Sequence, residues 1–187
     1  MSRLPRVFLM SAAIGVGLVG SVLADSPASE AEWERVLSLA AARQDVTVAP
    51  TADLARYRDI VARIDAAIAP SLAIYEDARE NATTPELRMM AAYGIGLTHL
   101  DAIIRARNAA LAGTADDYGQ RLATIEPMLV DHRIAAVGAF RDVHALAEEQ
   151  PRAAAANPVM TFIVADAGRQ THALQPSGES VPSISTR

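Results

Sequence analysis

The chain has 187 residues, of which 51% are hydrophobic and only 4% aromatic, and it contains no cysteine. The absence of cysteine excludes disulfides, thiolate-ligated zinc, iron–sulfur clusters and covalently attached c-type haem. All 17 basic residues are arginine and 22 residues are acidic, so the net charge of −5 argues against nucleic acid and anionic membranes as partners.

The N-terminus has the three parts of a secretory signal peptide. Arg3 and Arg6 form a basic start, an uncharged apolar run follows, and Val22 and Ala24 occupy the small-residue positions of a cleavage site. We therefore expect cleavage after Ala24, which removes residues 1–24 and gives a periplasmic or secreted protein without stable membrane insertion. A retained anchor is the alternative, although the run is near the lower limit of about 17–25 residues for a spanning helix. Cleavage would leave 15 arginines against 22 acidic residues, a net charge of −7.

Residues 25–174 are predicted to form one all-α domain. Alanine, which has the highest intrinsic helix propensity, dominates this part of the chain. Apolar residues recur at alternating spacings of three and four, which places them on one helix face. In the first long segment these residues are Leu54, Tyr57, Val61, Ile64 and Ile68. The charged residues between them that should face solvent are Asp59, Arg63 and Asp65.

Capping residues mark the expected starts of the first three helices. Ser29 and Glu32 have the spacing of a capping box for a helix that ends near Arg43. Thr51 is expected to cap the second helix. Thr84, which a proline follows, is expected to cap the third.

Similar signals divide the second half of the chain. Gly113 is the expected C-terminal end of the third helix, and Thr114 with Asp117 opens the next one. Pro151 should end the long helical segment that follows.

The C-terminal part contains one segment of ambiguous type. Asn157 and Pro158 are suited to start a short helix, but the apolar run at residues 159–165 is compatible with either a helix or a strand. Residues 175–187 have no apolar period and are expected to be a disordered tail.

The expected architecture is an up-and-down bundle of four or more helices joined by short turns. Pro70 and Pro127 lie inside helical patterns, in two similar sequences of the form I-x-P-x-L. Because an internal proline removes a backbone hydrogen bond and crowds the preceding turn, each should kink or restart its helix.

Two of the four histidines lie in one segment beside acidic residues. His132 and His144 are 12 residues apart, about 18 Å along a helix, so they cannot bind one ion from the same helix. His144 and Glu148 share a helix face and are weak metal candidates, but their spacing is also typical of a surface pair, which is favoured. We therefore expect His132, His144 and Glu148 to lie on the surface. No glutamate stands three residues before any histidine, which excludes the ferritin-like di-iron motif, and no cofactor is predicted.

Residues 89–113 are expected to form the central helix. Its large apolar residues fall on one stripe that is expected to face the core, namely Met90, Tyr93, Leu97, Leu100, Ile104 and Leu111. The remaining position on that stripe is Arg107, whose charge needs a partner or an exit to solvent. An arginine that reaches solvent at the bundle end is favoured over one that binds an anion in a pocket.

Two glycines beside this stripe indicate a close approach. Gly94 and Gly96 each cost about 1 kcal/mol relative to alanine inside a helix. A tight helix crossing at Gly94 would explain them. The alternative is a ligand cleft that Tyr93 and Arg107 contact.

Three functions remain open. The favoured one is a non-catalytic periplasmic or secreted interaction protein, such as an adaptor, a chaperone or a component of envelope machinery, with a protein as partner. The first alternative is a bundle that binds haem, a metal or a small molecule; the methionines available to haem are Met89, Met90, Met128 and Met160. The second is a helical enzyme with a carboxylate/arginine pocket that uses residues such as Asp101 and Arg107. The sequence has no nucleophile elbow and no glycine-rich phosphate loop, which disfavours catalysis.

Overall fold

The computed structural model describes residues 34, 51, 53–111, 117–156 and 158–175. The predicted signal peptide with its cleavage after Ala24, and the predicted tail beyond Gln175, lie outside the described residues. The same holds for the predicted first helix, apart from Glu34, which is helical.

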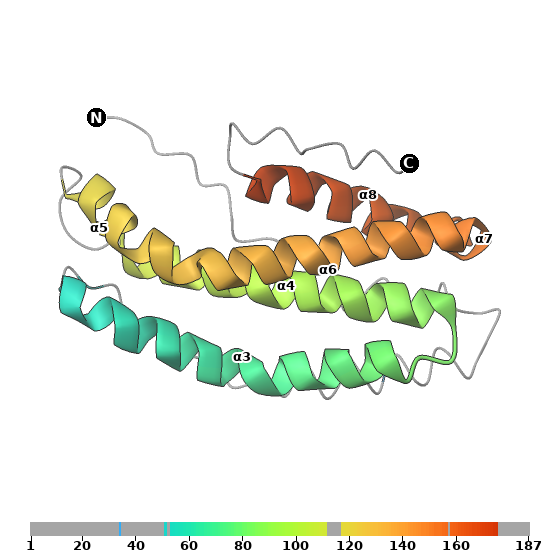
Figure 1. The fold of residues 1–187 in the computed structure, drawn as a ribbon, viewed down its shortest axis with the longest axis horizontal. Coiled ribbons are helices and arrows are strands. Elements are labelled where there is room, and N and C mark those ends of the chain that lie inside the picture. Colours follow the sequence, from blue (N-terminus) through green and yellow to red (C-terminus); the bar gives the residue numbers. More distant parts are fainter. Residues whose placement is uncertain (1–33, 35–50, 52, 112–116, 157, 176–187) are drawn as a thin grey trace, which may run out of the picture.

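Four long helices run up and down through the bundle, each antiparallel to the one before it (Figure 1). They are α3 (Tyr57–Glu80), α4 (Pro85–Ala109), α6 (Val130–Glu149) and α8 (Pro158–Leu174). The shorter pieces are η2 (Leu54–Arg56), α5 (Tyr118–Ile125), η3 (Glu126–Leu129) and α7 (Pro151–Ala154). Helix α4 packs between α3 and α6, and α8 packs on α6 and on part of α4. The all-α bundle is thereby confirmed. Residues 159–165 are helical, and none of the described residues forms a strand.

The predicted cap of the third helix is confirmed, whereas that of the second is wrong. The Thr84 hydroxyl accepts a hydrogen bond from the Leu87 amide at 3.3 Å at the start of α4. At the other site, the Asp53 carboxylate accepts from the Ala55 amide at 3.0 Å and caps the 3₁₀ turn η2. Thr51 lies two residues earlier and accepts from the Asp53 amide at 3.1 Å. Threonine and aspartate can each cap a helix, and sequence alone did not distinguish Thr51 from Asp53.

The boundaries in the second half agree in part with the expectations. Helix α6 ends before Pro151, as predicted, and α8 starts at Pro158. The Asp117 side chain makes no capping hydrogen bond to α5. Gly113, Thr114 and Asn157 lie outside the described residues.

The two internal prolines have different effects. At Pro127 the α-helix gives way to the 3₁₀ turn η3 before α6 begins, so the helix is restarted there. Pro70 lies inside α3, which continues through it and changes direction along its length (Figure 1). Both outcomes follow from the hydrogen bond that proline cannot donate.

Small residues dominate the buried face of the central helix. In α4, five buried alanines have at most 1% of their surface exposed, namely Ala91, Ala92, Ala102, Ala106 and Ala109. Part of the predicted apolar stripe is instead accessible, since Ile104 is 39% and Leu111 57% exposed. The stripe was chosen from the largest residues, but a helix surrounded by neighbours needs small side chains where they approach most closely. The prediction that the whole stripe lies in the core is therefore wrong.

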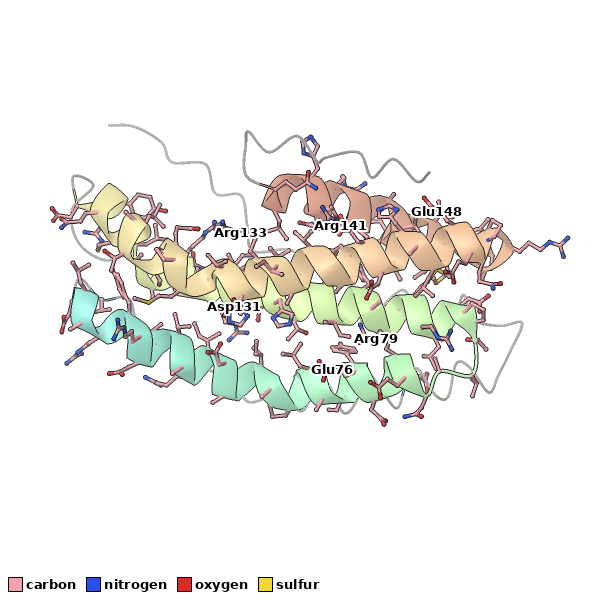
Figure 2. The ribbon with its side chains drawn as sticks, in the orientation of Figure 1. Glu76, Arg79, Asp131, Arg133, Arg141 and Glu148 are labelled. Atoms are coloured by element: carbon pink, nitrogen blue, oxygen red, sulfur yellow. The ribbon has the colours of Figure 1, made fainter. Side chains whose placement is uncertain are left out.

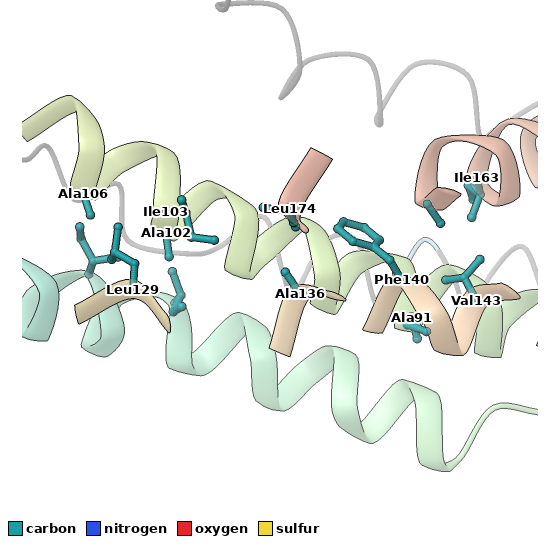
Figure 3. Close-up of a cluster of buried hydrophobic side chains, with 14 of the residues drawn as sticks. Ala91, Ala102, Ile103, Ala106, Leu129, Ala136, Phe140, Val143, Ile163 and Leu174 are labelled. Carbon is teal, nitrogen blue, oxygen red and sulfur yellow. The ribbon is translucent and has the colours of Figure 1, made fainter. Parts of the chain in front are cut away.

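Larger side chains from the flanking helices fill the space against α4. Phe140 and Val143 of α6 are fully buried, and Ile163 and Leu174 of α8 close the same cluster (Figure 3). From α3, the predicted residues Tyr57, Ile64 and Ile68 are buried and Val61 is partly buried, whereas Leu54, in η2, is 38% exposed. The charged residues predicted to face solvent, Asp59, Arg63 and Asp65, are exposed.

Within the described part of the chain, no helix combines the length and the apolar character that a membrane span requires.

Candidate functional site

Aromatic rings fill the space beside both glycines of α4. A Cβ atom on Gly94 would lie 2.7 Å from the Tyr75 ring of α3, and one on Gly96 would lie 2.5 Å from the Phe140 ring of α6. Such distances are shorter than van der Waals contact, so each glycine lets a ring approach the α4 backbone. The close approach expected at these positions is present, and the groups that approach belong to neighbouring helices.

Tyr93 links α4 to α8. Its hydroxyl donates a hydrogen bond to Asp166 Oδ2 at 2.6 Å, and its ring lies 5.9 Å from that of Phe140 between centroids. Asp166 is only 9% exposed and also accepts a hydrogen bond from Arg169 at 2.9 Å. Burial, together with the hydrogen bond to Asp166, raises the pKa of the Tyr93 phenol well above its ordinary value. Tyr93 therefore acts as a neutral donor that holds two helices together.

Arg107 has both a partner and an exit to solvent. Its Nε donates to Glu126 Oε1 at 2.6 Å, and its side chain is 41% exposed. Arg133 of α6 donates to the other oxygen of the same carboxylate. The hydrogen bond from Arg107 is the main cause that lowers the pKa of Glu126, so the carboxylate stays ionised between two guanidinium groups.

The proposed contacts of a ligand cleft do not come together. Tyr93 and Arg107 are 14 residues apart on one helix, which separates them by about 21 Å along its axis. They also have different partners, on α8 and on η3. Asp101, named for a carboxylate/arginine pocket, accepts a hydrogen bond from Arg105 of its own helix at 2.8 Å.

The two weak metal candidates, His144 and Glu148, differ in their burial. His144 is partly buried against α8, and its Nε2 lies 3.1 Å from the position of a Cβ on Gly168. Glu148 is exposed (Figure 2). In the part of the chain that the structure describes, no three His, Asp or Glu side chains are grouped in a way that could enclose a metal ion.

A polar chain that sequence reasoning missed connects three helices. His132 of α6 is hydrogen-bonded through Nε2 to Asp65 Oδ1 of α3 at 2.7 Å, and through Nδ1 to His99 Nδ1 of α4 at 2.9 Å. The two imidazole rings lie 5.2 Å apart between centroids. The His132 side chain is only 12% exposed, so the expectation that this residue faces solvent on the surface is wrong.

The hydrogen bonds indicate the protonation of this chain. A carboxylate can only accept, so Nε2 of His132 carries the proton donated to Asp65. When His132 carries no second proton, its Nδ1 accepts from His99. In that state His99 donates from Nδ1. Burial, and then the neighbouring His132, lowers the pKa of His99, which favours its neutral form. The chain thus orients two imidazoles across the α4–α6 interface.

Asp65, His99 and His132 are separated by 34 and 33 positions in sequence, so no local motif joins them. The only signal was positional. His99 lies one turn from Ile95 and Ile103 on the buried side of α4.

No protein-family model, curated protein or solved structure matches this chain.

Proposed function

We propose that this protein is an exported, non-catalytic interaction protein that binds a partner through the part of α4 and α6 beyond the end of α8. This region is called the α4/α6 surface here. Its residues are Ile104, Arg107, Leu111, Glu126, Val130, Arg133 and Ile134.

The register of the helices indicates where α8 stops. His144 of α6 lies against Gly168 of α8, and the two helices are antiparallel. Leu174, six residues further along α8, is therefore level with about residue 138 of α6. Val130 and Ile134 lie four to eight residues past that point, or roughly 6–12 Å. Figure 1 shows the same relation, because α8 ends before it reaches the start of α6.

Apolar residues continue on both helices beyond this point. On α6, Val130 is 42% exposed, and Ile134, one turn later, is 66% exposed. On α4, Tyr93 contacts α8, and Ile104 follows it by about three turns on the same face while being 39% exposed. Leu111, just after α4, is 57% exposed. Exposed apolar residues gathered in this way are typical of interaction surfaces, and this observation carries the proposal.

The charge of the α4/α6 surface indicates the chemistry of the partner. Arg107 and Arg133 share the single carboxylate of Glu126, which leaves one positive charge in a chain of net charge −5. Arg133 extends from α6 on the side where α8 lies (Figure 2). A guanidinium group that is partly exposed can bind a further carboxylate. The partner is therefore an apolar or amphipathic protein segment that carries an acidic side chain.

The test is co-purification of an untagged partner from the native host with three forms of this protein. These forms are the parent, Ile134→Glu and Ala62→Glu. Ile134→Glu places a second negative group on the apolar surface and should abolish recovery of the partner. Ala62→Glu adds the same charge to an exposed position of α3 and should leave recovery unchanged. Equal recovery with parent and Ile134→Glu would refute the proposed surface, and no specific partner with the parent would refute the function.

A further inference from the structure

We propose that His99 and His132 form a binding site for one divalent transition-metal ion, with Cu²⁺ bound more tightly than Zn²⁺. This inference goes beyond the proposed interaction function and does not depend on it. The site would join α4 to α6 at the middle of the bundle.

The separation of the two nitrogens fits a pair of ligands on one ion. Their Nδ1 atoms are 2.9 Å apart. Metal–nitrogen bonds of about 2.0 Å place two neighbouring ligands about 2.8–3.0 Å apart in square-planar geometry, and about 3.3 Å apart in a tetrahedron. The observed separation is compatible with square-planar Cu²⁺, which also leads the general order of affinities for such ligands. Both rings have to turn so that their lone pairs point to a common centre, and the terminal torsion of histidine is broad enough for this.

Asp65 supplies the support that histidine ligands of metals commonly have. Its Oδ1 lies 2.7 Å from Nε2 of His132, on the side of the ring away from His99. A carboxylate in this position fixes the tautomer in which Nδ1 is unprotonated and increases the basicity of that nitrogen. Neutral His132 is therefore already in the tautomer that binds a metal.

His99 reaches the same form by a change of tautomer. In the hydrogen-bonded pair its proton is on Nδ1, and metal binding requires that this proton move to Nε2 through solvent. The ring stays neutral, so no net proton is released from the pair. The described residues add no third side chain to the two imidazoles, and water molecules would complete the coordination.

A copper titration of the untagged protein, with CuCl₂ in a buffer that does not chelate metals, tests the site. One equivalent should bind, and the electron paramagnetic resonance spectrum should show coupling to two histidine nitrogens. His99→Gln and His132→Gln should each abolish this signal. Asp65→Asn should weaken binding about 10–100-fold, as is usual for the loss of such a support. ZnCl₂ should bind more weakly than CuCl₂.

Two other histidines provide matched controls. His172→Gln, at an exposed position of α8, and His144→Gln, against α8, should both keep the copper signal. Circular dichroism of each variant establishes whether it is folded. Should a variant unfold, the spectrum of the parent protein still decides, because copper coupled to one nitrogen or none overturns the proposal. Retention of parental affinity by folded His99→Gln and His132→Gln overturns it as well.

Discussion

The ring of Phe140 on α6 occupies the space where a side chain on Gly96 of α4 would lie, with the nearest ring carbon 2.5 Å from the Cβ position. Phe140 is fully buried, so it cannot move aside without disturbing the core. The glycine weakens the helix locally, and the packing of the ring against the exposed backbone offsets this cost.

Gly96→Ala should therefore lower the free energy of unfolding by about 1–3 kcal/mol through overpacking. Urea denaturation measures the change. Gly138→Ala is the control, since nothing lies within 4 Å of a Cβ at that exposed position of α6. That variant should gain about 0.5–1 kcal/mol from the better helix propensity of alanine. If Gly96→Ala gains stability like the control, Phe140 does not pack against the backbone as described.

Gly94 should tolerate a small side chain better than Gly96 does. The Tyr75 ring beside it is only partly buried, whereas the Phe140 ring beside Gly96 is fully buried. We expect Gly94→Ala to cost less than Gly96→Ala, whereas Gly94→Leu should cost a few kcal/mol because the longer side chain displaces the ring. Thermal unfolding of the three variants gives the order. A Gly94→Leu protein as stable as the parent would mean that this glycine faces open space, and a ligand cleft would then be the better interpretation.

Tyr93→Phe removes the hydroxyl that donates to Asp166. The carboxylate is nearly buried, so we expect a loss of about 1–3 kcal/mol in denaturant unfolding. The raised pKa of the phenol predicts a second effect. Folding favours the protonated phenol, so this stabilisation is present below pH 10 and declines as the pH rises above that value.

Absorbance at 295 nm follows the ionisation of the tyrosines. Burial also raises the pKa of Tyr57, so the parent should contain at least two phenols that ionise late. Tyr93→Phe should remove one of them. An unchanged late phase would show that Tyr93 ionises normally and does not donate to Asp166.

Glu126→Gln tests the ion pairs at the start of α6. The pKa of Glu126 is lowered by Arg107 and Arg133, so the folded state binds a proton there less readily than the unfolded state. Its stabilisation is complete above the ordinary value of 4.5 and is lost as the pH falls below it. The variant should be about 1 kcal/mol less stable than the parent at pH 7. The difference between the two should shrink as the pH falls below 4.5, as melting temperatures measured from pH 7 to pH 3 would show. A constant difference across this range would exclude the ion pair as its cause.

His132→Ala removes both hydrogen bonds of the chain between α3, α4 and α6. We expect a loss of about 1–3 kcal/mol, because a partly buried group on either side loses its partner. His172→Ala, at an exposed position, should change stability by no more than about 0.5 kcal/mol. Equal effects in guanidinium unfolding would mean that the chain contributes nothing to the fold.

Local patterns predicted the bundle, whereas contacts between helices could not be read from them. Alanine content, the spacing of Tyr57, Ile64 and Ile68, and the cap at Thr84 depend on neighbours in sequence, and the structure agrees with all of them. The glycines of α4 indicated a close approach but not which ring would fill it. His132 was placed in solvent because its partner residues lie on other helices.

Arg107 shows how far one residue could be interpreted. The stripe predicted that its charge would need a partner or solvent, and it has both. That Arg133 shares the same carboxylate depends on the restart of the helix at Pro127, which brings Glu126 to the end of α4.

Site-specific photocrosslinking in the native host most directly tests the claim that the α4/α6 surface binds a protein. A photoreactive amino acid at position 134 should crosslink to one partner of defined mass, whereas the same group at position 62 on α3 should give none. Peptide mapping should locate the crosslink in an apolar segment of the partner that contains an acidic residue. Equal crosslinking from both positions, or none from position 134, would contradict the proposed surface.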